Sequence, residues 1–148
     1  MIKNERQYRI TKAQAEKFAK TLHDLTSTQN HGVHPVLHKA QMDALKSQLG
    51  DLHSELSEYE VLRSGKRKVM ALVSLEELPR TLIQARIASG LSQEELAAKL
   101  GLKPQQIQRY EATEYQSASF ERVTAITRAL GVKLRQPAEL RLVSLGDL

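Results

Sequence analysis

The 148-residue sequence contains no cysteine and no tryptophan, and glycine, proline and aromatic residues are few. Without cysteine the chain can form neither a disulfide nor a thiolate metal site. It has no run of about 18 apolar residues that could span a bilayer, and its first residues, MIKNERQYRITK, lack the apolar core of a signal peptide. These absences predict a cytoplasmic protein that has no membrane partner.

What the sequence does contain favours helices and a basic second half. Leu, Ala and Gln recur, and helix-breaking residues are sparse, which predicts an all-α fold. The formal net charge is +5, with 9 Lys and Arg against 8 Asp and Glu in residues 1–64, and 13 against 9 in residues 65–148. The excess of cations in the second part indicates a surface that can meet phosphates.

Residues 1–64 have the spacing of an antiparallel helical hairpin. Apolar residues recur alternately every three and four positions along two segments, as on one narrow stripe of each helix. These residues, the hairpin seam, are Tyr8, Thr11, Ala15, Phe18, Leu22, Leu25, His38, Met42, Leu45, Leu49, Leu52, Leu56 and Tyr59. Between the segments, residues 26–35 carry Gly32 and Pro35, which predict a loop. So narrow a stripe must pack on its own domain, on a second copy or on a partner.

Residues 65–73 are predicted to be a linker, because Ser64 and Gly65 interrupt the helical pattern and a basic run follows. The apolar residues of 68–74 do not alternate cleanly, so this stretch is either a short strand or an extended lead-in. The tail, residues 133–148, also leaves short strands open.

Residues 74–132 are predicted to form a second domain of short helices. Helices are expected at 79–89, 93–100, 104–112 and 120–130. Ser74 with Glu77, and Ser92 with Glu95, have capping-box spacing, while Gly90 and Gly101 follow helix ends. The residues expected to face the interior are Leu82, Ile83, Arg86, Ile87, Ile107, Tyr110, Phe120, Val123, Ile126 and Leu130.

Two short helices joined through a turn at Gly101 have the form of a helix-turn-helix, whose second helix can enter the major groove of DNA. Here helix 104–112 begins with Pro104 and is rich in polar side chains. Glutamine pairs with adenine and arginine with guanine in that groove. We therefore expect Gln105, Gln106, Gln108 and Arg109 to contact base edges.

Residues 79–131, and especially the segment LSQEELAAKLGLKPQQIQRYE, resemble the phage-repressor and Cro type of DNA-binding domain, the XRE family. The family's positions are matched at Arg86, Ser92, Gln93, Leu96, Ala97, Gly101, Ile107 and Glu111. The resemblance implies a lambda-repressor-like helix-turn-helix domain in which Gln93 binds a DNA phosphate. It also implies an internal ion pair between Arg86 and Glu111, which is structural rather than part of the binding site. The residues expected to bind DNA are Gln93, Lys103, Pro104, Gln105, Gln106, Gln108 and Arg109.

The sequence departs from the family pattern at two places. Relatives often have glycine and a basic residue just after the glutamate, whereas this chain reads EATEYQSAS with Glu114 nearby. Pro104 stands where relatives usually offer a polar side chain, so one base contact is expected to be apolar, for example to a thymine methyl group.

The expected function is a dimeric, sequence-specific repressor that binds double-stranded DNA and carries no cofactor. The alternative is an antitoxin, whose partner is a toxin protein bound by the hairpin. No catalytic residues are predicted, because the chain lacks a phosphate-cradling glycine loop and a His-Glu motif. His31, His34 and His38 have spacing that a metal can use, but no carboxylate lies within the cluster, so solvated loop histidines are the expectation.

Overall fold

The computed structural model describes residues 1–27, 32, 34–137 and 139. Its elements, in chain order, are α1 (Glu5–Ser27), α2 (Pro35–Arg63), a 3-10 turn η1 (Leu75–Glu77), α3 (Leu78–Ala88), α4 (Gln93–Leu100), α5 (Pro104–Ala112) and α6 (Phe120–Ala129). The described residues include no strand, which confirms the predicted all-α fold. Residues 66–73 are irregular, so the alternative of a strand there is wrong. The last nine residues of the tail lie outside the described part of the chain.

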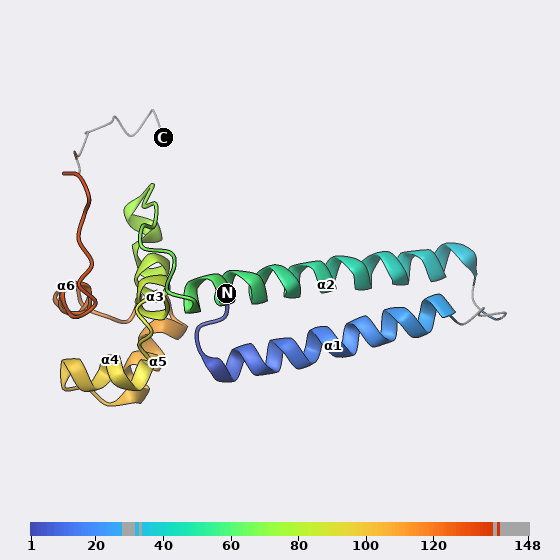
Figure 1. The fold of residues 1–148 in the computed structure, drawn as a ribbon, viewed down its shortest axis with the longest axis horizontal. Coiled ribbons are helices and arrows are strands. Elements are labelled where there is room, and N and C mark those ends of the chain that lie inside the picture. The colour runs from blue at the N-terminus through green and yellow to red at the C-terminus, as the bar shows by residue number, and fades with distance from the viewer. Residues whose placement is uncertain (28–31, 33, 138, 140–148) are drawn as a thin grey trace.

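Helices α1 and α2 form the predicted antiparallel hairpin, which projects from one end of the short helices α3–α6 (Figure 1). Every residue of the hairpin seam is buried or half-buried, and the most buried lie near the short helices, at Tyr8, Ala15, Leu56 and Tyr59. Toward the far end, seam residues such as Leu22 and Met42 are only half-buried. Much of the loop between the helices lies outside the described residues.

The base of the hairpin is held by aromatic and charged side chains. The rings of Tyr8 and Tyr59 stack with centroids 5.4 Å apart, and the guanidinium of Arg63 lies 4.7 Å from the Tyr8 centroid. Arg63 also pairs with Glu5 at 3.1 Å, and the Tyr8 hydroxyl donates to Glu60. These contacts join the start of α1 to the end of α2. They therefore hold the first turn of α1 close to the short helices α3–α6.

Helix α2 ends where the chain turns back toward α3. Gly65 adopts a φ of +66°, and a Cβ there would lie 3.4 Å from the carbonyl oxygen of Ala88. The Glu58 carboxylate accepts from Gln84 of α3 at 3.0 Å and pairs with Arg80 at 3.4 Å. Leu62, fully buried, belongs to the same apolar cluster as the core of α3–α6. The hairpin and the short helices thus share one continuous core.

Helix α3 begins one residue before the predicted position and is preceded by η1. The expected capping box does not form: the Ser74 side chain makes no cap hydrogen bond, and the Glu77 carboxylate accepts at 3.1 Å from the amide of Val73, one residue ahead of the cap. Pro79 falls in the first turn of α3, where its missing N–H costs no helical hydrogen bond. The predicted helix at 79–89 is therefore present as α3, and residues 75–77 ahead of it form the separate turn η1.

The predicted interior residues of α3, α5 and α6 are buried or half-buried, except Phe120, which is 85% exposed. Phe120 precedes the fully buried Ile126 by six residues, which places it about 120° away around the helix. Ser119 caps α6 by accepting from the Arg122 amide at 3.2 Å, so Phe120 is the first helical residue. The prediction that Phe120 packs inward is wrong for this reason.

Candidate nucleic-acid interface

Helices α4 and α5 are delimited by the residues that the sequence pattern identified. The Glu95 amide donates to Ser92 Oγ at 3.1 Å, and the Ser92 amide donates to the Glu95 carboxylate at 2.7 Å, which forms the predicted capping box. This backbone hydrogen bond to the carboxylate lowers the pKa of Glu95. Gly101 ends α4 with a φ of +65°, and Pro104 starts α5. The two helices therefore meet through a short turn, as in a helix-turn-helix.

A buried ion pair locks α5 onto α3. Arg86 is 2% exposed and Glu111 is fully buried. Arg86 Nε donates to Glu111 Oε1 at 2.5 Å and Nη2 to Oε2 at 2.8 Å, so the contact is bidentate. Arg86 Nη1 also donates to the carbonyl of Leu91 at 2.8 Å. The ion pair implied by the family resemblance is confirmed, and it fixes the orientation of α5.

The N-terminal segment completes this polar network. Arg86 Nη2 donates to the Lys3 carbonyl at 2.6 Å, and Lys3 Nζ donates to the Glu111 carbonyl at the same distance. Asn4 Nδ2 donates to Gln93 Oε1 at 3.2 Å, while Gln93 Nε2 donates to Glu111 Oε2 at 2.7 Å. Both ends of the Gln93 amide are therefore engaged, and the side chain is only 8% exposed. A phosphate contact by Gln93, as the resemblance implies, would require this side chain to leave its partners.

The outer face of α5 presents three polar side chains together. Gln105, Gln108 and Arg109 are exposed, and their spacing of three and four residues puts them on one side of the helix. Gln106 behaves differently, because its Oε1 accepts from the Lys103 amide at 3.1 Å and its side chain is half-buried. Of the remaining residues that the sequence suggested, Lys103 is exposed beside this face and Pro104 is half-buried.

The segment after α5 adopts an unusual backbone at the place where the sequence departs from the family pattern. Glu114 and Tyr115 have φ values of +47° and +61°, a conformation that favours glycine. Tyr115 is nevertheless 4% exposed and stacks on Tyr110 with centroids 6.4 Å apart. Burial raises the pKa of the Tyr115 hydroxyl, and the charge of Glu111 raises it further. The buried ring holds this turn, while Glu114 stays exposed.

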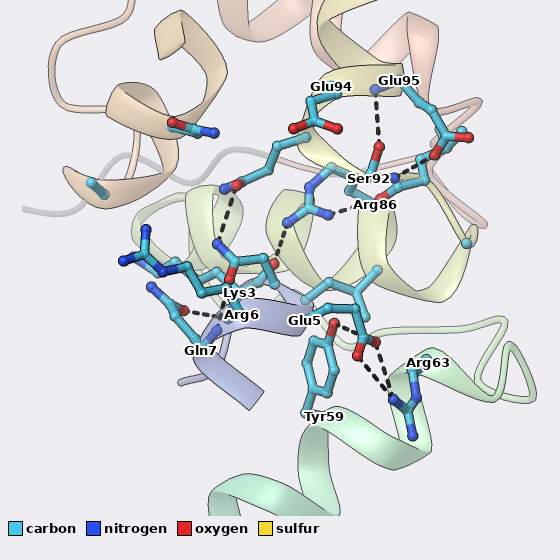
Figure 2. A pocket seen from close by; sticks show the side chains of 17 residues that line it. Lys3, Glu5, Arg6, Gln7, Tyr59, Arg63, Arg86, Ser92, Glu94 and Glu95 are labelled. Carbon is cyan, nitrogen blue, oxygen red and sulfur yellow. Dashed lines mark hydrogen bonds and ion pairs between the residues drawn. The ribbon is translucent and has the colours of Figure 1, made fainter. Parts of the chain in front are cut away.

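A groove lies between the first turn of α1 and the two helices of the helix-turn-helix (Figure 2). Its walls come from residues 3–7 of the N-terminal segment, residues 90–95 around the start of α4, and Gln108 and Ala112 of α5. Figure 2 shows Arg6 and Gln7 on one side of the α1 turn, away from Glu5, Tyr59 and Arg63. The polar face of α5 therefore continues into a surface supplied by the hairpin.

Sequence reasoning missed the contribution of residues 3–7 to this site. Asn4 and Gln7 do have the three-residue spacing of a helix start, and the Gln7 amide donates to Asn4 Oδ1 at 2.9 Å. That local pattern gives no indication of contacts with residues more than 80 positions away.

The histidine cluster is only partly described. His34 is exposed and its Nδ1 accepts from the Val36 amide at 3.3 Å, while His31 lies outside the described residues. Within the described part of the chain, no group of three or more His, Cys, Asp or Glu side chains is placed to hold a metal ion.

The short helices, with a buried ion pair behind an exposed polar helix, define a helix-turn-helix DNA-binding domain. Residues 82–136 match the family model described as Helix-turn-helix, so this part of the chain is an XRE-type domain, the DNA-binding module of transcription regulators. The match covers 55 of the 148 residues and leaves α1 and α2 outside it. No curated protein and no solved structure matches the chain. None of the helices in the described part of the chain has both the length and the apolar character that a membrane span requires.

Proposed function

We propose that the protein reads a specific DNA sequence in the major groove with α5, acts as a homodimer, and represses transcription by occluding a promoter. The observation that carries this proposal is the joint exposure of Gln105, Gln108 and Arg109 on one side of α5. The ion pair behind α5 supports the proposal, because a rigid helix presents its side chains in a fixed register. The major groove, about 12 Å wide, accepts one such helix.

The two kinds of DNA contact can be separated by substitution. Arg109→Ala should cost roughly 1–3 kcal/mol on the preferred sequence and relax the preference at one base pair. Lys103→Ala should weaken binding to all sequences alike and flatten the dependence of affinity on salt. Lys46→Ala, on the exposed surface of α2, is the matched control and should change neither. An equal loss on every sequence for Arg109→Ala would rule out base recognition by Arg109.

The hairpin supports the dimer. Its far end leaves Leu22, Leu25, Met42 and Leu45 half-buried, and a second hairpin packed there would form a four-helix bundle that covers them. Charge favours the same arrangement: α1 has 5 basic and 3 acidic residues, and α2 has 3 basic and 5 acidic residues. A dimer would also place two copies of α5 on half-sites about one helical turn apart. Sedimentation of the full chain should give twice the monomer mass at micromolar concentration, and a monomer at every concentration would contradict the dimer.

An antitoxin role is the second candidate, and the projecting hairpin favours it. The half-buried seam that would bind a second copy is equally a surface for a toxin protein. The two roles differ in what covers the seam. If the pure protein stays monomeric and a toxin-like protein encoded beside it forms a stable complex through the hairpin, the antitoxin role is supported.

A further inference from the structure

We propose that Arg6, in the first turn of α1, binds a phosphate of the DNA backbone, so that the hairpin forms part of the DNA interface. This inference rests on the proposed DNA binding by α5 and adds a contact from outside the helix-turn-helix domain. Arg6 and Gln108 line the same groove, one from α1 and the other from the exposed face of α5. The sugar-phosphate backbone of a duplex runs along both sides of its major groove. With α5 in the major groove, one DNA strand therefore passes the protein groove that Arg6 and Gln108 line.

The first turn of α1 is held in a defined place beside α4 and α5. Asn4 caps α1 through Oδ1, and through Nδ2 it donates to Gln93 at the start of α4. Lys3 donates from Nζ to the Glu111 carbonyl at 2.6 Å, which ties the same segment to the end of α5. Arg6 follows two residues after Asn4. The backbone of Arg6 is therefore fixed relative to α5, and only the Arg6 side chain has to move to reach a DNA phosphate.

Arg6 is also the available cation in this groove. Three other cations line it: Lys3 is bonded to the Glu111 carbonyl, Arg63 to Glu5, and Arg86 to Glu111. Arg6 is exposed, and no hydrogen bond or ion pair joins it to another residue in the described part of the chain. A guanidinium with free donors binds phosphate through two parallel hydrogen bonds.

Three acidic side chains, Glu5, Glu94 and Glu95, line the groove together with Arg6, and the Glu5 carboxylate pairs with Arg63. The Glu95 carboxylate accepts from the Ser92 amide in the capping box, whereas Glu94 is exposed and makes no hydrogen bond or ion pair with another described residue. Glu94 weakens the attraction of the groove for an anion. Removing its charge should therefore strengthen DNA binding, in the direction opposite to removing Arg6.

The position of Arg6 in the first turn of α1 is not explained by helix stability. A cation in the first turn opposes the helix dipole, which favours negative charge there. Gln93, the residue that the family resemblance assigns to a phosphate, is nearly buried and has both amide ends bonded. Arg6 supplies from the neighbouring wall of the groove the phosphate contact that Gln93 is not free to make.

The test compares full-length Arg6→Ala with Lys12→Ala, an exposed cation on the same helix that does not line the groove. Equilibrium binding is measured on the preferred duplex and on an unrelated duplex, from about 50 to 200 mM salt. Arg6→Ala should lower affinity for both duplexes by roughly three- to tenfold and reduce the salt slope by about one, since one phosphate contact is lost. Arg6→Lys should keep the salt dependence of the native protein, and Glu94→Gln should raise its affinity for DNA. Lys12→Ala should change neither the affinity nor the salt dependence by much.

Circular dichroism separates binding from folding, because Arg6→Ala should leave the thermal midpoint unchanged or slightly raised. If the native protein binds DNA and Arg6→Ala behaves like Lys12→Ala, the Arg6 contact is refuted while recognition by α5 stands. A changed sequence preference in Arg6→Ala would also overturn the phosphate assignment. If the native protein binds no duplex, the proposed function and this inference both fail.

Discussion

The buried pair of Arg86 and Glu111 makes a strong prediction about stability. Arg86→Met removes the cation and leaves a carboxylate fully buried without its charge partner. Breaking a buried ion pair in this way costs about 3–5 kcal/mol. The substitution also removes donors from the carbonyls of Leu91 and Lys3, which adds to the loss unless water reaches them. Since a domain of this size is stable by about 5–15 kcal/mol, Arg86→Met should bring the protein near its folding threshold.

The double variant Arg86→Met with Glu111→Leu should be far less damaging than the sum of its parts. With both charges gone, neither is left buried and uncompensated, and an apolar pair can fill the space. We expect a coupling energy of roughly 2–3 kcal/mol between the two positions. Urea unfolding followed by circular dichroism measures the free energy of unfolding for the native chain, both single variants and the double variant.

A result in which the two single losses are small, or simply add, would refute this reasoning. Small losses would mean that water compensates the remaining charge and that the pair is not sealed from solvent. Additive losses would mean that Arg86 and Glu111 stabilise the fold through separate partners rather than through each other.

Two further predictions concern pH and backbone conformation. Burial, with the neighbouring charge of Glu5, raises the pKa of Tyr59 to about 12, so the folded chain holds its proton where the unfolded chain, with an ordinary pKa near 10, loses it. The free energy of unfolding should therefore fall as pH rises from about 10 to 12, and less steeply in Tyr59→Phe; an identical pH profile in that variant would contradict the assignment. Gly101→Ala should destabilise by about 1 kcal/mol because φ is +65°, whereas Gly50→Ala, in open space on the exposed side of α2, should stabilise by about 0.5–1 kcal/mol. Urea unfolding measures both changes, and a shared sign would refute the conformational argument.

The helices could be predicted because their determinants are local. Ser92 and Glu95 lie three residues apart and cap α4 by direct hydrogen bonds, and Gly101 takes the left-handed conformation that its position implies. The hairpin seam is likewise a periodic pattern within each helix. Phe120 shows the limit of such patterns, because the predicted helix does begin there, but helical spacing alone did not show that its first residue faces outward.

The candidate site was only partly predictable, because its organisation depends on contacts across the chain. The polar face of α5 follows from spacing, and the ion pair behind it follows from the family resemblance. The hydrogen bond from Arg86 to the Lys3 carbonyl spans 83 positions, and the one from Asn4 to Gln93 spans 89. No local sequence pattern predicts either bond. They place the hairpin against the DNA-binding domain and engage Gln93, which changes how a phosphate contact can be made.

The central claim is that α5 reads a specific DNA sequence as part of a symmetric pair. Selection of bound duplexes from a random library at about 0.15 M salt, with competitor DNA and the intact chain, tests this claim directly. The account predicts a two-fold symmetric consensus with half-sites about one helical turn apart. If no sequence is enriched over competitor, α5 does not read bases, and the polar face of the helix has another partner.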